Sequence, residues 1–108
     1  MYKYLLKLRI ISKKILVTFY TKQPKAKTAL EEWYKRVKNA EWENFADIKK
    51  QFNSVGNVGN KRYVFNIKGN DYRLIVIILF VSKTVYIRFI GTHVQYDKIK
   101  DIQNIWND

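Results

Sequence analysis

The spacing of apolar residues changes near residue 60, and this change divides the chain into a helical half and a strand half. Up to that point apolar residues recur at steps of three and four, the spacing of a helix that buries one face. Beyond it, apolar and polar residues alternate in three runs, which is typical of strands. We therefore expect one α+β domain, with an N-terminal strand, helices packed on one face of a mainly antiparallel sheet, and a C-terminal helix.

The helical half is expected to open with a strand at residues 8–11 and then to form three helices. Ser12 can cap the first helix, and Pro24 suits the start of the second because its ring fixes φ. Asn44, followed by Asp47 three residues later, resembles a cap for the third helix. The apolar positions of the three helices are Ile15, Leu16, Phe19 and Tyr20, then Ala26, Leu30, Trp33, Val37 and Ala40, then Phe45, Ile48 and Phe52. We assign Trp33 and Trp42 to the core.

Three strands are predicted at residues 61–67, 71–81 and 84–91, and the stretch 53–60 before them is predicted to be a turn. Gly69-Asn70 and Ser82-Lys83 would join the strands into two hairpins. If each loop has two residues, the expected cross-strand pairs are Asn66 with Arg73, Arg73 with Thr92, and Ile77 with Arg88.

Directly opposed residues share a face, so this register sorts the strand residues into two sets. The uncharged set, expected beneath the helices, is Tyr63, Phe65, Ile67, Tyr72, Leu74, Val76, Ile78, Phe80, Val85, Ile87 and Phe89. The opposite set is Arg62, Val64, Asn66, Arg73, Ile75, Ile77, Leu79, Tyr86, Arg88, Ile90 and Thr92. A three-residue loop at Ser82-Lys83 would mix the sets, and their clean separation favours the even loops.

The chain's one histidine, His93, follows the last strand. Thr92 can cap a final helix there, which would put His93 at or near its first turn. The apolar positions of that helix would be Val94, Ile99, Ile102 and Trp106.

The composition limits the chemistry that the protein can perform. The 108 residues suit one domain, and the absence of cysteine excludes disulfides and thiolate metal sites. One histidine offers little to a transition metal, so we expect no metal and no cofactor. The 21 lysines and arginines against 9 acids give a net charge of +12, spread along the chain. This charge suits a nucleic acid, although an anionic membrane or an acidic protein would also be attracted.

Nothing in the sequence predicts export or membrane insertion. The apolar stretch in MYKYLLK is too short for a signal peptide, and the longest apolar run, Leu74 to Val81, is too short to span a bilayer. We therefore expect a cytoplasmic protein without a membrane partner.

Metal-free cleavage of RNA needs a base for the 2′-hydroxyl proton, an acid for the departing 5′-oxygen and cations at the phosphate. His93 suits the proton transfers because imidazole changes charge near neutral pH. Arg73 and Arg88 suit the phosphate, since guanidinium binds two oxygens at once and stays charged.

Each of these residues also has a structural interpretation. His93 can be a surface or capping residue, and the arginines can belong to a structural ion pair. Tyr96 can donate a proton, stack on a base or pack on the sheet, while Asp97 can orient His93 or favour the helix N-terminus by its charge.

Supporting and RNA-binding positions complete the set of candidates. Thr92, Asp97 and Asn66 are expected to support the catalytic residues. Contacts with the RNA backbone are expected from Lys13, Lys14, Lys61, Arg62 and Lys98.

Four stretches of the chain resemble the HigB toxins, which are RelE-like mRNA interferases of bacterial type II toxin–antitoxin modules. They are LRIISKK, LEEWYKRVKNAEWENFADIKKQF, VGNKRYVFNIKGNDYRLIVII and VYIRFIGTHVQYDKI, and together they span nearly everything from Leu8 onward. The most specific parts match the family patterns F-N-x-x-x-N-x-[YL]-R and T-H-x-x-Y-D without a gap. Residues 1–7 have no counterpart; they are an upstream start or an extension of the first strand.

The resemblance implies a RelE-like fold and a toxin that cleaves mRNA on the translating ribosome. Its implied partners are mRNA, the ribosome, and a HigA-like helix-turn-helix antitoxin through which it would reach operator DNA. In the matched motifs, the resemblance implies four active-site candidates: Arg73, Arg88, His93 and Tyr96. Two alternatives stay open: a non-catalytic RNA- or ribosome-binding module, and an inactive co-repressor bound to its antitoxin.

Overall fold

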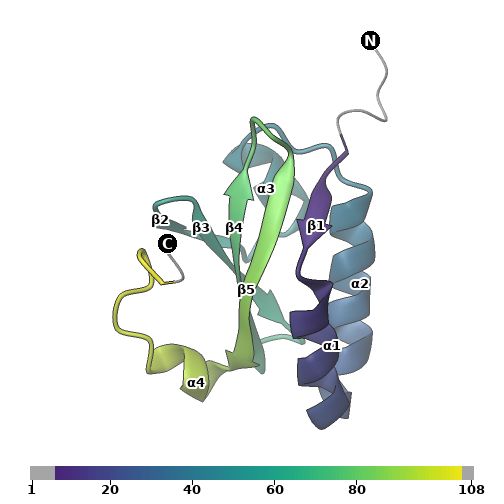
Figure 1. Ribbon diagram of the computed structural model, residues 1–108, viewed down its shortest axis with the longest axis vertical. Coiled ribbons are helices and arrows are strands. Elements are labelled where there is room, and N and C mark those ends of the chain that lie inside the picture. Colours follow the sequence, from purple (N-terminus) through teal and green to yellow (C-terminus); the bar gives the residue numbers. More distant parts are fainter. Residues whose placement is uncertain (1–6, 106–108) are drawn as a thin grey trace.

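A computed structural model describes residues 7–105 of the chain, which form a mixed five-stranded sheet with helices packed on it (Figure 1). The strand order is β1-β5-β4-β3-β2. Only the pairing of β1 with β5 is parallel within this described part. The strands are β1 (Arg9–Ile11), β2 (Gly56–Gly59), β3 (Arg62–Ile67), β4 (Tyr72–Leu79) and β5 (Thr84–Thr92). The predicted α+β class is confirmed.

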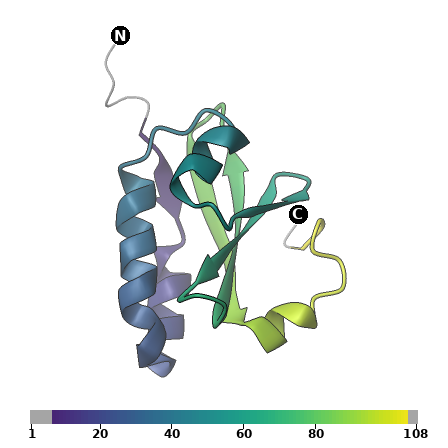
Figure 2. The ribbon, with the colours of Figure 1, turned by 180° about the vertical axis from the view of Figure 1, so that it is seen from behind.

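The first two helices lie side by side next to β1, and the last helix follows the far end of β5 (Figures 1 and 2). A 3-10 turn, Pro24–Ala26, leads from the first helix into the second, as the proline predicts. The helices are α1 (Lys13–Lys22), α2 (Lys27–Lys38), α3 (Phe45–Gln51) and α4 (His93–Asp97). No helix within residues 7–105 has the length and apolar character that a membrane span requires.

The helical periodicity correctly predicts the buried faces of α1, α2 and α3. Asn44 also caps α3 as expected, because its Oδ1 accepts a hydrogen bond of 3.0 Å from the Asp47 N–H. Ser12 does not cap α1 with its side chain; it has a left-handed φ of 76°. The buried residues of these helices are Leu16, Leu30, Trp33, Val37 and Ile48. Ala26 and Ala40, just outside α2, are buried as well.

An aromatic cluster around Phe65 of β3 joins the helices to the sheet. The ring of Phe65 meets Phe52 and Trp33 edge to face, with centroids 5.1 and 5.4 Å apart, and stacks on Trp42 at 6.3 Å. Both tryptophans are 2% exposed, which confirms their assignment to the core. Large rings packed in this way bury much apolar area and fix the angle between helices and sheet.

The predicted register of the β3–β4 hairpin is confirmed, whereas that of β4–β5 is wrong. Asn66 pairs with Arg73, but Arg73 pairs with Gly91 rather than Thr92, and Ile77 pairs with Tyr86 rather than Arg88. Two features cause the difference. The connecting loop runs over residues 80–83, and a β-bulge opposite Ile75 and Val76 leaves Arg88 as an extra residue in β5.

The bulge places three side chains of β5 on the face opposite to the one predicted. One of them is Thr92, which pairs with Tyr72 of the helix-covered face rather than with Arg73. Ile90 pairs with Leu74 and is 8% exposed in the helix-covered core, while Phe89 pairs with Ile75 on the opposite face. Simple alternation predicts the reverse. The extra residue at the bulge moves each later residue of β5 to the other face, which alternation does not anticipate.

Part of the face opposite α1–α3, which we call the open face, is also buried. Val64 and Ile75 are 6% and 0% exposed, although both lie outside the main core cluster. Residues 98–105 return on this side toward β2 (Figure 1). The final helix is therefore shorter than predicted: it ends at Asp97, Val94 is 57% exposed, and Trp106 lies outside the described residues.

The predicted turn at residues 53–60 contains the edge strand β2. Gly56 pairs with Val64, and Gly59 with Arg62. Asn60 and Lys61 connect the strands with φ of 50° and 66°, the conformation of a type I′ turn that matches the twist of a hairpin.

Candidate active site

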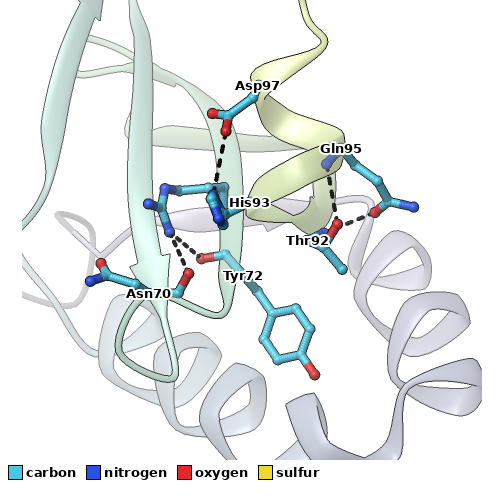
Figure 3. Close-up of polar contacts among 7 residues, drawn as sticks. Asn70, Tyr72, Thr92, His93, Gln95 and Asp97 are labelled. Atoms are coloured by element: carbon cyan, nitrogen blue, oxygen red, sulfur yellow. Dashed lines mark hydrogen bonds and ion pairs between the residues drawn. The ribbon is translucent and has the colours of Figure 1, made fainter.

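The first turn of α4 is fixed to the end of β5 by a capping box. The Thr92 hydroxyl accepts a hydrogen bond from the Gln95 N–H at 3.1 Å, and Gln95 Oε1 accepts one from the Thr92 N–H at 2.8 Å (Figure 3). The backbone N–H of His93 donates to the carbonyl of Asp71 at 3.3 Å. These contacts confirm Thr92 as a cap and place His93 beside the start of β4.

His93 and Asp97 face one another across one turn of α4 (Figure 3). Nδ1 of His93 lies 3.4 Å from Oδ2 of Asp97, and the two side chains are 52% and 62% exposed. A carboxylate at Nδ1 favours a proton on that nitrogen, which leaves Nε2 to exchange a proton with a substrate. The pair thus has a geometry suited to acid–base chemistry at an accessible surface.

Arg73 brings a cation to this helix from β4. Its Nη1 donates to the carbonyls of Asn70 and Tyr72 at 3.0 and 3.4 Å, and the guanidinium lies 6.0 Å from the ring centroid of Tyr96. The structure therefore brings together three of the four catalytic candidates, with His93 and Tyr96 on α4 and Arg73 beside them. Asn66, the cross-strand partner of Arg73, donates to Asn70 Oδ1 at 3.3 Å and so supports the same loop.

Arg88 stands apart from this group because it is the bulge residue. Its guanidinium lies 5.0 Å from the ring centroid of Tyr86, and its Nε is buried without a hydrogen-bond partner in the part of the chain that the structure describes. The bulge faces Ile75 and Val76, at least two residues along β4 from Arg73, which corresponds to about 7 Å of strand. The two arginines are thus not cross-strand neighbours. The predicted register also separated them, since it placed Arg88 opposite Ile77, four residues along β4 from Arg73.

Gly91 and Gln95 also shape the site, and the prediction of site residues missed both. Gly91 is the cross-strand partner of Arg73, and a Cβ there would lie 2.6 Å from both Gln95 Oε1 and a ring carbon of Phe89. The sequence does contain a signal for Gln95, because Thr92 and Gln95 have the spacing of a capping box.

Most of the predicted RNA-binding residues are exposed, but Arg62 is not. The exposed ones are Lys13, Lys14, Lys61 and Lys98. Nζ of Lys13 lies 4.4 Å from the ring centroid of Tyr34 on α2, so this lysine contacts α2 rather than α4. Arg62 is 4% exposed and donates to backbone carbonyls of Asn60 and Ile105. Contrary to the prediction, the structure does not present Arg62 to a phosphate, because its buried donors are already bound to carbonyls.

The arrangement contains proton-transfer and cationic groups rather than a metal-ligand set. Across residues 7–105 no three His, Asp or Glu side chains gather closely enough to hold a metal ion.

Residues 26–99 match the family described as HigB_toxin, a RelE-like toxic component of a toxin-antitoxin system. The chain belongs to this HigB toxin family. The matched segment includes β2–β5 and α4, and with them Arg73, Arg88, His93 and Tyr96. The family resemblance predicted from the two sequence motifs is thereby confirmed.

Individual HigB relatives match over most of the chain. The mRNA interferase HigB of Escherichia coli O6:H1 is 31% identical over 94 residues, which cover 85% of this chain and 91% of the relative. The mRNA interferase toxin HigB of Escherichia coli K12 is 32% identical over 92 residues, which cover 83% of this chain and 88% of the relative. The mRNA interferase HigB of Shigella flexneri matches with the same identity and coverage.

Proposed function

We propose that this HigB-family chain is the toxin of a type II toxin–antitoxin module and acts as an endoribonuclease on mRNA. Support comes from relatives named as mRNA interferases and from one feature of the site: the exposed His93–Asp97 pair stands beside a cation, Arg73, that carries no carboxylate partner in the described residues. A fixed cation next to an acid–base group is what phosphoryl transfer by the 2′-hydroxyl requires.

The proposed reaction is an attack of the 2′-hydroxyl on the neighbouring phosphate. The 2′-oxygen attacks the adjacent phosphorus as its proton passes to a base, and the bond from phosphorus to the 5′-oxygen breaks as that oxygen takes up a proton. The products are a 2′,3′-cyclic phosphate and a 5′-hydroxyl. His93 transfers one of the two protons through Nε2, and Tyr96 shares proton transfer or stacks on a base next to the cleaved bond.

The cations have separate tasks in this proposal. Arg73, which faces Tyr96, binds the scissile phosphate and offsets the charge that builds on its oxygens. Arg88, held on Tyr86 at the bulge, binds a neighbouring phosphate. Lys61 and Lys98 contribute weaker, sequence-independent attraction to the RNA backbone.

The physiological setting completes the proposal. The substrate is mRNA on the translating ribosome, no metal takes part in the bond-breaking step, and a HigA-like helix-turn-helix antitoxin neutralises the toxin. The net charge of +12 suits both the ribosomal RNA that surrounds the message and an acidic surface on an antitoxin.

Primer extension on a defined mRNA in a translating extract tests the activity. The parent protein is compared with Arg73→Ala and His93→Gln, and each reaction is repeated with translation initiation blocked. Cuts that depend on translation and vanish in both variants are expected. The upstream fragment should carry a 2′,3′-cyclic phosphate, whereas hydrolysis by a metal-bound water would leave a different end.

Two results would replace this proposal. If the parent binds ribosomes or RNA but makes no cuts, the protein is a binding module and His93 serves α4 as a surface residue. If it shows neither cleavage nor growth inhibition but binds its antitoxin tightly, it acts as a co-repressor.

A further inference from the structure

The guanidinium of Arg62 joins two segments that are distant in the sequence. Nη1 donates to the carbonyl of Asn60 at 2.9 Å, and Nη2 donates to the carbonyl of Ile105 at 2.7 Å. Arginine is seldom buried to this degree, and its two hydrogen-bond partners within residues 7–105 are both backbone carbonyls. Arg62 therefore links β3 to the end of the C-terminal segment.

Two side-chain amides strengthen this link. Asn60 Nδ2 donates to the carbonyl of Gln103 at 2.7 Å, and Gln103 Nε2 donates to the carbonyl of Val58 at 2.9 Å. Together with the bond from Arg62 to Ile105, they give three hydrogen bonds between the β2–β3 hairpin and residues 103–105. We call the group formed by Val58, Asn60, Arg62, Gln103 and Ile105 the clasp.

The hairpin turn is shaped to fit the clasp. Asn60 and Lys61 occupy left-handed positions, which aim the Asn60 amide at Gln103. Gly59, with φ of 96°, lies so close to this side chain that a Cβ would be 2.7 Å from Gln103 Nε2. The backbone at residue 59 and the Gln103 amide are therefore in direct contact.

Stability alone gives a poor account of arginine at position 62. Its Nε is buried and has no hydrogen-bond partner among residues 7–105, so part of the desolvation cost of the guanidinium is not recovered there. The two Nη groups, in contrast, bind one carbonyl on each side of the link. The arginine is thus suited to holding two pieces of chain at a fixed distance.

Helix α4 needs such an external support. It has five residues, none of them buried, whereas an isolated helix is marginal below about 12–15 residues. The capping box and the bond from His93 to Asp71 hold its first turn. Its C-terminal end, with Tyr96 and Asp97, is joined through residues 98–102 to the segment that the clasp holds.

We propose that Arg62 is a positioning residue of the active site: by fastening residues 103–105 to the β2–β3 hairpin, it holds the C-terminal end of α4, and so keeps Tyr96 beside Arg73 and Asp97 beside His93. This inference rests on the proposed nuclease function for its effect on catalysis. Its structural part, the coupling of the clasp to α4, is independent of that function.

Two clasp variants and one control test the coupling. Arg62→Lys retains the charge but cannot reach two carbonyls in the same fork geometry. Asn60→Gly removes the amide while keeping a residue that readily adopts φ of 50°. The control is Asn39→Ala, which removes an exposed amide-to-carbonyl bond of 3.0 Å at the end of α2.

Two readouts are measured on the full chain: amide hydrogen exchange at residues 93–98, and the kcat and KM for mRNA cleavage on programmed ribosomes. Both clasp variants should speed exchange in α4 by about 10-fold or more while β4 stays protected, since local opening is independent of global unfolding. Their kcat should fall by about 10-fold at nearly constant KM, because misplacement of a catalytic group by 1 Å can cost up to about 100-fold. Asn39→Ala should match the parent in both readouts.

Several outcomes would overturn the inference. These are unchanged α4 exchange in the clasp variants, an equal acceleration in Asn39→Ala, and a raised KM with a weaker salt dependence, which would make Arg62 an RNA contact after all. Should Arg62→Lys fail to fold, the exposed Asn60→Gly substitution decides the question alone. A parent protein that cuts no RNA would refute the proposed function, while the exchange data would still decide whether the clasp holds α4.

Discussion

Nδ1 of His93 lies 3.4 Å from Oδ2 of Asp97, and both side chains are more than half exposed. Water screens a pair in this setting, so the attraction between its charges is worth at most about 1 kcal/mol. In the proposed mechanism the carboxylate therefore mainly orients the imidazole ring, and the ring performs the proton transfer.

The two residues should differ sharply in mutational effect. His93→Gln is expected to lower the cleavage rate by about 100-fold or more, the usual contribution of a general acid or base. Asp97→Asn should lower it by no more than about 5-fold, because an exposed pair contributes so little. Single-turnover cleavage of mRNA on programmed ribosomes measures both. Equal losses would contradict this division of roles between the ring and the carboxylate.

Substitutions of Arg73 and Arg88 should affect different steps, cleavage for Arg73 and RNA binding for Arg88. Arg73→Lys should reduce the cleavage rate at saturating substrate by about 100-fold, the typical effect of losing one donor to a developing oxyanion. Arg88→Lys loses the planar contact with Tyr86 and should instead weaken RNA binding, with a smaller effect on the rate.

Binding for this comparison is measured with RNA that carries a 2′-deoxy substitution at the cut site, so that no product forms. The Arg73 and Arg88 variants both retain a positive charge, so a difference between them reports geometry. An effect of Arg88→Lys on rate alone, with unchanged binding, would place Arg88 at the scissile phosphate.

Gly91→Ala should disturb the site without touching a catalytic side chain. The new methyl would displace Gln95 Oε1, which accepts the Thr92 N–H in the capping box, and would press on Phe89. We expect a loss of about 1–3 kcal/mol in the free energy of unfolding, the usual cost of overpacking, together with reduced cleavage. Urea unfolding followed by tryptophan fluorescence gives the stability.

The matched control for this substitution is Gly56→Ala. Gly56 also lies in a strand, but a Cβ there would meet nothing within 4 Å. The free energy of unfolding of the Gly56→Ala variant should differ from that of the parent by less than about 1 kcal/mol, in either direction. If both variants lose a similar free energy of unfolding, the side chains around Gly91 move aside for the new methyl without cost.

Alkaline solution should destabilise the fold through Tyr63. Burial raises the pKa of the Tyr63 phenol above its ordinary value of 10.0, because the phenolate would lose its hydration among Phe45 and Phe80. The unfolded chain therefore releases this proton at a lower pH than the folded chain. The contribution to stability is complete below pH 10 and falls as pH rises from there toward the folded-state pKa.

Tyr63→Phe removes this proton and should flatten the alkaline decline in the free energy of unfolding. Urea titrations of parent and variant between pH 8 and 11 measure the difference, in which the contributions of the other tyrosines cancel. Parallel curves would mean that Tyr63 ionises equally in both states.

The sequence predicts those parts of the structure that depend on local patterns. The faces of α2 and α3, the cap at Asn44 and the register of β3 with β4 all follow from spacing and turn residues. The bulge at Arg88 does not, since no glycine or turn residue accompanies it and its position depends on pairing with β4. That one residue is why simple alternation places Phe89 and Ile90 on the wrong faces.

Long-range contacts explain the other differences. The apolar spacing of Ile99 and Ile102 imitates a continuing helix, but the clasp draws this segment toward β2 instead. A charge count likewise cannot distinguish an arginine on the surface from Arg62, whose partner Ile105 lies far along the chain. The grouping of Arg73, His93 and Tyr96 was predictable because these residues belong to two short motifs. Their catalytic roles stay predictions.

The parallel pairing of β1 with β5 has a consequence for synthesis. β1 is made before the other strands, yet its hydrogen-bond partner, Thr84–Tyr86, is made after them. A nascent chain therefore cannot complete the sheet until the segment just before His93 has emerged. Contacts between residues so distant in the sequence form slowly, after the local contacts. Because β5 also carries α4, a ribosome that stalls or releases the chain early yields an open sheet without the proposed catalytic helix, so that incomplete copies should be harmless to the cell that makes them.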